Sequence, residues 1–322
     1  MPTIPPQLIE TVVYLYPDRV SATNSETPGG TGFLVGVKFS SVNALLFHIY
    51  AVTNHHVAIT GANSCIRVNK RGGGADLFEF APDDWEFIPG LDLAAVPMPF
   101  DAQKYVTQFI PNAFFMTDEI AKGVKLNIGE DVFMIGSFVD NHGDAINTPA
   151  ARFGNISLMP SILEVGDSQA SIKYRGPYYC LDMRSRTGFS GSPVFYYRTA
   201  GSDLSMAGST SMRLEPPTVA LIGAHAGQFP ETIGFEDKAG NKAKLTAPSG
   251  MTMVIPTEKI LELLNVKKFA DARRAIESDF LTKNPILKNS PVLESSKPTT
   301  TGDDVPKVML NTPPKQHKGV SN

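Results

Sequence analysis

The sequence predicts an all-β protein built from two β-barrels, and three observations support this fold class. Most of the chain consists of short segments rich in β-branched and aromatic residues, separated by Gly, Pro, Asn and Asp. About a dozen such segments lie between residues 11 and 255, which is more than one small barrel holds. Clear helical spacing of apolar residues begins only after Pro256, so the strands do not alternate with helices as in parallel sheets.

The predicted strands form two groups on either side of residues 110–130. The first group comprises residues 11–16, 31–39, 46–53, 64–69, 77–80 and 92–97. The second group comprises residues 131–138, 153–159, 169–174, 193–198, 218–226 and 250–255. This division predicts two six-stranded antiparallel barrels packed together.

Helices and a tail are predicted after the strands. The segment "TEKILELLN" carries apolar residues at helical spacing, with Thr257 as the expected N-cap and Glu258 in the first turn, where the helix dipole favours an acid. A second helix is expected over residues 265–281. Residues 282–322 contain six prolines and no aromatic residue, so we expect a disordered tail there.

Composition narrows the classes of partner and location. The net charge of −3 and the pI of about 6.1 give no general attraction to nucleic acid or to an anionic membrane. No run approaches the roughly 20 apolar residues of a membrane helix, and the N-terminal segment lacks the features of a secretory signal. Cys65 and Cys180 are too few for a disulfide framework, so we expect free thiols and a cytoplasmic location.

Three short stretches contain candidate catalytic residues, in the order His, Asp, Ser along the chain. They are "VTNHHV" at 52–57, "GLDLAAVPM" at 90–98 and "RTGFSGSPVF" at 186–195. Each stretch adjoins a predicted strand, so all three can meet at strand ends that face one cleft. This order and placement are typical of nucleophilic catalysis by a serine.

Ser190 in the third stretch is the expected nucleophile. A serine hydroxyl is a weak nucleophile at neutral pH and needs a base, which a histidine supplies, while a buried carboxylate such as Asp92 fixes the tautomer of the imidazole. Gly188 lets the backbone curl so that its own N–H and that of Ser190 point to one spot and form an oxyanion hole. Asp83 and Asp84 are competing carboxylates, but their surroundings indicate a solvated turn.

The three stretches resemble the signatures of the trypsin-like, chymotrypsin-fold serine peptidases. "AVTNHHV" is similar to the "VTNAHV" form of the family, which implies that His56, and not His55, is the catalytic base. "LDLAAV" implies Asp92 as the acid, and "GFSGSP" implies Ser190 as the nucleophile. "TGFLV" at 31–35 resembles the strand that precedes the histidine. The resemblance implies an endopeptidase that acts on a protein or peptide through an acyl-enzyme.

The resemblance spans roughly residues 8–264 and implies a peptidase domain over residues 1–264, with the site between two barrels. Phe189 stands where activatable members carry Asp, and no "IVGG"-like start is present, so that zymogen switch is not expected. No cofactor or metal is expected either. His55 and His56 would point to opposite faces of a strand, so they do not form a metal pair, and we expect His55 to have no chemical role.

A fourth stretch, "IGAHAGQ" at 222–228, resembles a strand of glutamyl endopeptidases and of the chymotrypsin-like proteases of small RNA viruses. There a histidine recognises Glu or Gln before the cut, which implies substrate-binding roles for His225 and Gly227, together with Ser185 and Thr187 ahead of the nucleophile. Arginines flank Ser185 and would favour a carboxylate. The alternative that His225 is a satisfied core histidine stays open.

Two other functions can be set against the sequence pattern. An α/β-hydrolase needs G-x-S-x-G on a strand–helix elbow with the acid and the histidine after the serine, whereas here they precede it and Ser192 occupies the second glycine position. A catalytically silent binding or regulatory protein of the same fold remains the alternative. A regulatory partner could engage the helix over residues 265–281 or the tail over residues 282–322.

Overall fold

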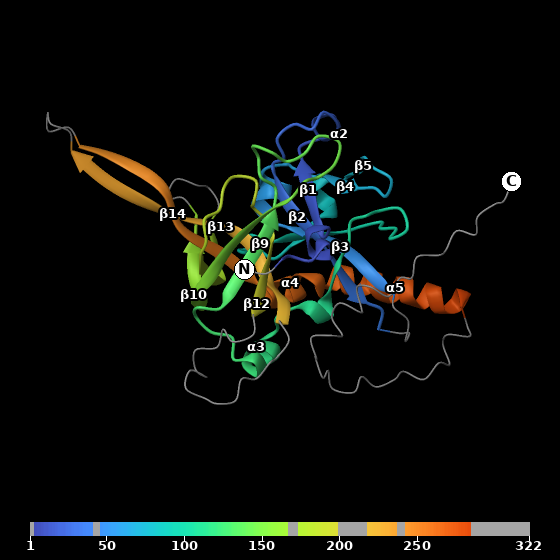
Figure 1. The fold of residues 1–322 in the computed structure, drawn as a ribbon. Coiled ribbons are helices and arrows are strands. Elements are labelled where there is room, and N and C mark those ends of the chain that lie inside the picture. Colours follow the sequence, from blue (N-terminus) through green and yellow to red (C-terminus); the bar gives the residue numbers. More distant parts are fainter. Residues whose placement is uncertain (1–2, 41–45, 167–172, 199–217, 237–241, 285–322) are drawn as a thin grey trace.

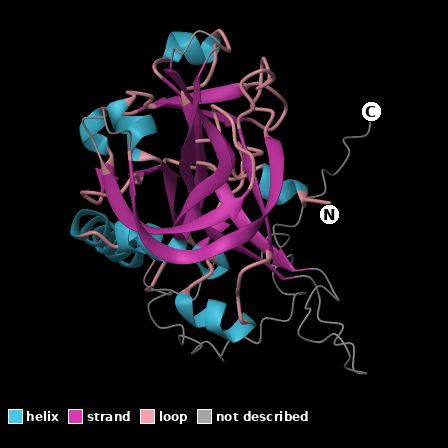
Figure 2. Ribbon diagram, turned by 90° about the vertical axis from the view of Figure 1, so that its left-hand side faces the viewer, coloured by secondary structure: helices cyan, strands magenta, loops and turns pink. Residues whose placement is uncertain are grey.

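The computed structural model describes residues 3–40, 46–166, 173–198, 218–236 and 242–284 (Figure 1). Strands occupy the centre of the molecule and helices lie at its periphery (Figure 2). The predicted all-β, chymotrypsin-like arrangement is confirmed, because two antiparallel β-systems follow one another along the chain and helices end the described part. The predicted tail lies outside the described residues from residue 285 on.

The first eight strands form one sheet in the order β5-β4-β1-β2-β3-β7-β6, and β8 pairs in parallel with β2. The strands are β1 (Val12–Tyr16), β2 (Gly30–Lys38), β3 (Phe47–Thr53), β4 (Cys65–Asn69), β5 (Ala75–Glu79), β6 (Glu86–Phe87), β7 (Ala94–Pro97) and β8 (Ile110–Pro111). The predicted closed barrel of six strands is corrected here to an eight-stranded sheet without closure among the described residues. The extra strands β6 and β8 are two residues long, too short to leave an alternating pattern in the sequence.

The last six strands close into a barrel in the order β10-β11-β14-β13-β12-β9. They are β9 (Asp131–Gly136), β10 (Ala150–Val165), β11 (Tyr174–Asp182), β12 (Pro193–Arg198), β13 (Thr218–Glu236) and β14 (Lys242–Pro256). Beyond the barrel, β13 and β14 continue as a projecting two-stranded ribbon (Figure 1).

The predicted strand 169–174 is displaced in the structure. Residues 169–172 lie outside the described part, and β11 begins at Tyr174 instead. Gly176 and Pro177, which signal a break in a sequence pattern, lie inside this strand. Pro177 is tolerated because β11 pairs with β14 only from Tyr179 onward, so no second neighbour requires its missing N–H.

Helices flank both β-systems. They are α1 (Pro6–Ile9), α2 (Arg19–Thr23), α3 (Asp118–Val124), α4 (Thr257–Leu264) and α5 (Lys267–Lys283), with short 3₁₀ turns at Pro82–Asp84 and Asn112–Phe114 and a π-helical turn at His56–Thr60. Thr257 is not the N-cap of α4: Pro256 takes that position, and the Thr257 hydroxyl donates to the carbonyl oxygen of Met116 at 2.6 Å. Helix α5 extends two residues into the predicted tail.

One apolar core joins the two β-systems. It contains Phe33 and Leu93 from the first sheet and Phe133 and Phe195 from the barrel, all almost fully buried. Burial of this kind contributes about 1.5–3 kcal/mol per large side chain, so the two units hold each other in a fixed relation. That fixed relation matters because the predicted site residues come from both units.

Candidate active site

His56 and Asp92 meet because β3 and β7 are neighbours. The register places Thr53 at the end of β3 opposite Ala94 at the start of β7, which brings the residues just beyond each strand together. Asp92 lies in the turn before β7 rather than on a strand, and it is 3% exposed. The side chain of Asn54 donates to the carbonyl oxygen of Asp92 at 2.8 Å and fixes that turn.

The carboxylate of Asp92 holds His56 at two points. Its Oδ2 lies 2.7 Å from Nδ1 of His56, and its Oδ1 accepts the His56 backbone N–H at 2.9 Å. A carboxylate accepts, so Nδ1 carries the proton and Nε2 is left with a basic lone pair. The His56 side chain is 38% exposed, so solvent or a substrate can reach the imidazole ring.

Ser190 lies in a tight turn between β11 and β12. The turn is closed by hydrogen bonds from the Phe189 amide to the Arg186 carbonyl and from the Ser192 amide to the Phe189 carbonyl. Gly188 has φ +96° and Gly191 has φ +82°, a backbone region that favours glycine. Phe189 is fully buried and anchors the turn by packing, which a charged residue at this position would not do.

The turn is fastened to both β-systems. In the first sheet, the Thr31 amide donates to the Ser190 carbonyl at 2.8 Å and the Thr31 hydroxyl donates to the Gly188 carbonyl at 2.6 Å. In the barrel, the Gly191 amide donates to the His225 carbonyl at 3.0 Å. A Cβ at Gly191 would collide with Thr31, so the close approach of the turn to β2 depends on this glycine.

The structure therefore brings the predicted residues to one place. A Cβ at Gly191 would also lie 3.2 Å from the amide nitrogen of Asn54, two residues before His56. Neither the Gly188 amide nor the Ser190 amide donates a hydrogen bond to another described residue, so both are available to an incoming oxyanion. Within the described residues, the hydroxyl of Ser190 makes no hydrogen bond with His56.

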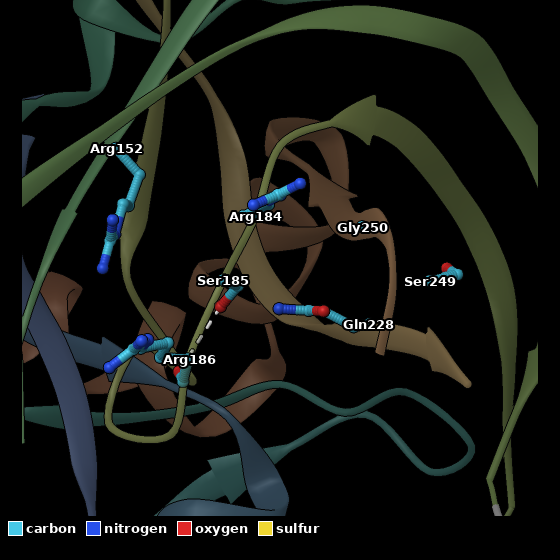
Figure 3. A pocket seen from close by; sticks show the side chains of 7 residues that line it. All are labelled: Arg152, Arg184, Ser185, Arg186, Gln228, Ser249 and Gly250. Atoms are coloured by element: carbon cyan, nitrogen blue, oxygen red, sulfur yellow. Dashed lines mark hydrogen bonds between the residues drawn. The ribbon is translucent and has the colours of Figure 1, made fainter. Parts of the chain in front are cut away.

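A pocket of about 450 Å³ opens beside the turn around Ser190 (Figure 3). Its lining is polar and basic, and comprises Arg152, Arg184, Ser185, Arg186, Gln228, Ser249 and Gly250. Arg186 forms an exposed ion pair with Asp140 at 3.2 Å, whereas Arg184 has no carboxylate partner among the described residues. None of the described residues that line the pocket is acidic, so the pocket favours an anionic ligand.

The predicted substrate-binding residues divide into two groups. Ser185 lines the pocket, as its predicted role requires, and its hydroxyl is turned to the Arg186 carbonyl at 3.4 Å. Thr187 is exposed in the turn and Gly227 is half-buried in β13, and neither lines this pocket. His225 does not line it either, because its ring is covered on all sides and is 2% exposed.

His225 is a buried imidazole without the partners that a core histidine normally has. Neither ring nitrogen has a hydrogen-bond partner in the described part of the chain. Burial, together with the nearby charge of His56, lowers the pKa of His225 to about 3, although the Phe189 carbonyl acts in the opposite direction. The ring is therefore neutral at pH 7 and lies close enough to His56 for the two imidazoles to influence each other electrostatically.

Several lining residues could not be found from the sequence. Arg152 lies on β10, and its guanidinium group sits over the rings of Phe138 and Phe189 at 5.8 and 5.7 Å. Gln228 ends the "IGAHAGQ" stretch, and Ser249 and Gly250 come from β14. Strand pairing over long sequence separations brings these residues together, and no local motif signals it.

The described ranges contain no cluster of three or more His, Cys, Asp or Glu residues with the geometry of a metal site. Cys65 and Cys180 are both free and buried. Among the described helices, none has the length and apolar character needed to cross a membrane.

Comparison with known proteins gives matches among solved structures. No family model matches the chain, and no curated protein matches it. The MamO protease domain from Magnetospirillum magneticum in its apo form is 17% identical, covers 81% of this chain and 98% of that chain, and superimposes with a TM-score of 0.47. The active form of the Rv3671c protease from M. tuberculosis is 17% identical, with 82% and 89% coverage and a TM-score of 0.41. The inactive form of Rv3671c is 15% identical, with 80% and 88% coverage and a TM-score of 0.40.

Proposed function

We propose that this chain is a serine endopeptidase that uses His56, Asp92 and Ser190. The observation that carries the proposal is the double contact between Asp92 and His56, which orients the ring and leaves Nε2 basic. A buried carboxylate held against a partly exposed imidazole is costly to build for stability alone, which supports a functional role for the pair.

The reaction follows from these positions. His56 takes the proton of the Ser190 hydroxyl as the oxygen attacks the peptide carbonyl carbon. The amides of Gly188 and Ser190 stabilise the negative charge on the carbonyl oxygen. His56 then gives its proton to the leaving amine, and water, activated by the same ring, hydrolyses the acyl-enzyme and restores Ser190.

Fluorophosphonate labelling tests this proposal. Wild-type protein should label at Ser190, identified by mass spectrometry of the modified peptide, and the Ser190→Ala and His56→Ala variants should not label. Ser192→Ala is the matched control, because its hydroxyl is fully buried and has no hydrogen-bond partner among the described residues. Labelling that persists in Ser190→Ala would disprove the assignment of the nucleophile.

The proposed specificity is for Glu or Gln before the scissile bond, with Glu favoured. The pocket beside the turn around Ser190 presents Ser185 and three arginines, and none of its described lining residues is acidic. Arg184 is free to form a charge-assisted hydrogen bond to a carboxylate, which is about twice as strong as one between neutral groups. His225 would add an imidazole to this recognition if a bound side chain displaced the groups that cover it.

A library of peptides that differ only in the residue before the cut tests the specificity. We expect kcat/KM to be highest for Glu, lower for Gln, and lowest for Lys and Leu. Arg184→Gln should reduce the ratio of Glu to Gln cleavage by about tenfold, the effect of roughly 1.4 kcal/mol. The control Arg274→Gln alters an exposed arginine of α5 and should leave the ratio unchanged. Cleavage confined to Lys or Leu would refute the acidic preference.

One observation favours the alternative, a silent protein of the same fold. The Ser190 hydroxyl makes no hydrogen bond with His56 among the described residues. Such bonds are often loose in unliganded hydrolases and tighten on substrate binding, so the distinction needs chemistry. A silent protein would bind a Glu-containing peptide without labelling at Ser190 and without cleaving it.

A further inference from the structure

The hairpin formed by β10 and β11 leaves the barrel and reaches the first sheet beside the catalytic pair. The Arg175 amide donates to the Gly90 carbonyl at 2.9 Å, in the turn that carries Asp92. Gly176 lies against Leu91 so closely that a Cβ would collide with it. A strand of the barrel is thus fastened to the turn that presents the catalytic acid.

Tyr174, the first residue of β11, extends this contact to the neighbouring histidine. Its hydroxyl lies 3.1 Å from Nδ1 of His55, and the two ring centroids are 6.0 Å apart. The opposite side of His55 contacts Phe87, with centroids 4.7 Å apart in an edge-on arrangement. Thr60 Oγ1 is 3.3 Å from the same Nδ1, so His55 is held by its ring and by its nitrogen.

The surroundings of Tyr174 and His55 keep both side chains uncharged at neutral pH. Burial, and then the charge of Asp92, raise the pKa of Tyr174 to about 12, so its hydroxyl stays protonated and donates. Burial lowers the pKa of His55, and the neighbouring His56 acts in the same direction, although Asp92 opposes both. At neutral pH the His55 ring is neutral, and in the tautomer with the proton on Nε2 its Nδ1 accepts from the Tyr174 hydroxyl.

His55 is well placed to transmit this contact. It is the N-cap residue of the π-helical turn His56–Thr60, and its backbone is already helical, with φ −58° and ψ −43°. The next residue is His56, whose amide and ring both bind Asp92. A shift of the His55 backbone therefore changes the position of the His56 ring directly.

We propose that Tyr174 is a positioning residue, which fixes His55 from the barrel side and thereby holds the His56–Asp92 pair in its reactive geometry. This inference rests on the proposed function and deepens it. It gives His55, which the sequence predicts to have no chemical role, a structural role in catalysis. It also makes the packing of the two β-systems part of the catalytic machinery, because the base lies in one and its support lies in the other.

The variant Tyr174→Phe tests this proposal, because it removes only the hydroxyl and keeps the ring that packs on His55. We expect kcat and the rate of fluorophosphonate labelling to fall about 10- to 100-fold, the effect of a small misplacement of a catalytic group, with KM unchanged. Tyr105→Phe is the matched control: this buried tyrosine donates to Asp76 at 3.0 Å and lies away from the site. A purely structural role for Tyr174 would lower the thermal midpoint and leave the labelling rate as in wild type.

A second variant tests whether Tyr174 influences the labelling rate through His55. If Tyr174 acts through His55, then His55→Asn should slow labelling to a similar extent, and the double variant Tyr174→Phe/His55→Asn should be no slower than the worse single variant. Additive losses would mean that Tyr174 acts by another route and would overturn the proposal.

NMR separates failure of this inference from failure of the proposed function. The proton between Nδ1 of His56 and Asp92 should give a low-field signal in wild type and in Ser190→Ala, whether or not Ser190 reacts. We expect Tyr174→Phe to shift or broaden this signal and Tyr105→Phe to leave it unchanged. An identical signal in Tyr174→Phe would overturn the proposal, and a wild type that shows the signal but does not label at Ser190 would refute the peptidase function alone.

Discussion

Asp92 binds both the backbone amide and the ring nitrogen of His56, at 2.9 and 2.7 Å. Two contacts from one carboxylate fix the position of the residue and the orientation of its ring together. The carboxylate is 4% exposed, so water does not compete for these bonds, and Asn54 holds the carbonyl of the same residue. The tautomer of His56 thus depends on a single acidic group.

Asp92→Asn should abolish most of the activity while preserving the fold. The amide is nearly the same size, but its NH₂ group cannot accept from Nδ1, so the ring takes the other tautomer and Nε2 loses its basic lone pair. We expect kcat to fall about 10⁴-fold with little change in KM, measured with a Glu-containing peptide. Asp83→Asn, in an exposed 3₁₀ turn, is the control and should match wild type. Equal losses in both variants would exclude a special role for Asp92.

Gly188→Ala should disable the oxyanion hole. The new Cβ would lie 2.8 Å from a side-chain carbon of Val139 and 2.9 Å from the Ser137 carbonyl oxygen, at a φ of +96°. The turn must shift, so we expect at least a 100-fold lower kcat, the typical effect of losing one oxyanion donor.

Gly129→Ala isolates the backbone strain, since its φ is +92° and no atom lies within 4 Å of the new Cβ. This control should lose about 1–2 kcal/mol of stability in urea unfolding and keep its kcat. A similar kcat in Gly188→Ala would contradict the assignment of the hole.

The sequence could indicate His56, Asp92 and Ser190 as candidate site residues because each of the three motifs is local. The turn around Ser190 needs glycine at two positions of positive φ, and the carboxylate precedes a strand that must pair with the strand before His56. Each of these requirements can be recognised in the sequence within a few residues of Ser190 or Asp92. The same is true of the strands, whose alternation and turn residues indicate most of the β-structure.

The remaining features depend on contacts between distant segments. Arg152, which lines the pocket, and Tyr174 lie on β10 and β11, and the pairing of these two strands brings Tyr174 to His55. The sequence just after Tyr174 contains Gly176 and Pro177, which normally indicate a turn, so the pattern does not predict a strand there. His225 was predicted to face the substrate, but its covered ring depends on packing inside the barrel, which no motif encodes.

His225 should make the protein less stable in acid. The folded protein keeps this ring neutral down to about pH 3, whereas the unfolded chain takes up a proton near pH 6.5. Stability therefore falls as the pH is lowered from about 6.5 toward 3, by up to about 1.4 kcal/mol per pH unit. Between pH 7 and pH 5, wild type should lose about 2 kcal/mol more than His225→Leu in urea unfolding.

The loss of stability in wild type has to be compared with that in His225→Leu, because burial also lowers the pKa of His48 and of His55. These two histidines therefore also make the folded protein less stable as the pH falls. Their contributions are common to wild type and to His225→Leu and cancel in the difference. Equal losses in the two proteins would show that His225 is protonated in the folded state.

Glu277 should hold helix α5 to the first sheet. Its carboxylate lies 3.0 Å from Nε2 of His48 and accepts from the amide and hydroxyl of Ser40, and the side chains of Glu277 and His48 are each 7% exposed. Glu277→Ala would leave the buried His48 ring and the Ser40 amide and hydroxyl without this acceptor, so we expect a loss of about 1–3 kcal/mol in urea unfolding. Asp279→Ala removes an exposed carboxylate paired with Lys283 and should change stability by less than about 1 kcal/mol.

Because His48 is near the start of β3 and His56 follows its end, kcat should stay within about twofold of wild type in both variants. A large fall in kcat for Glu277→Ala at a temperature where the protein is folded would instead mean that α5 communicates with the catalytic pair along β3.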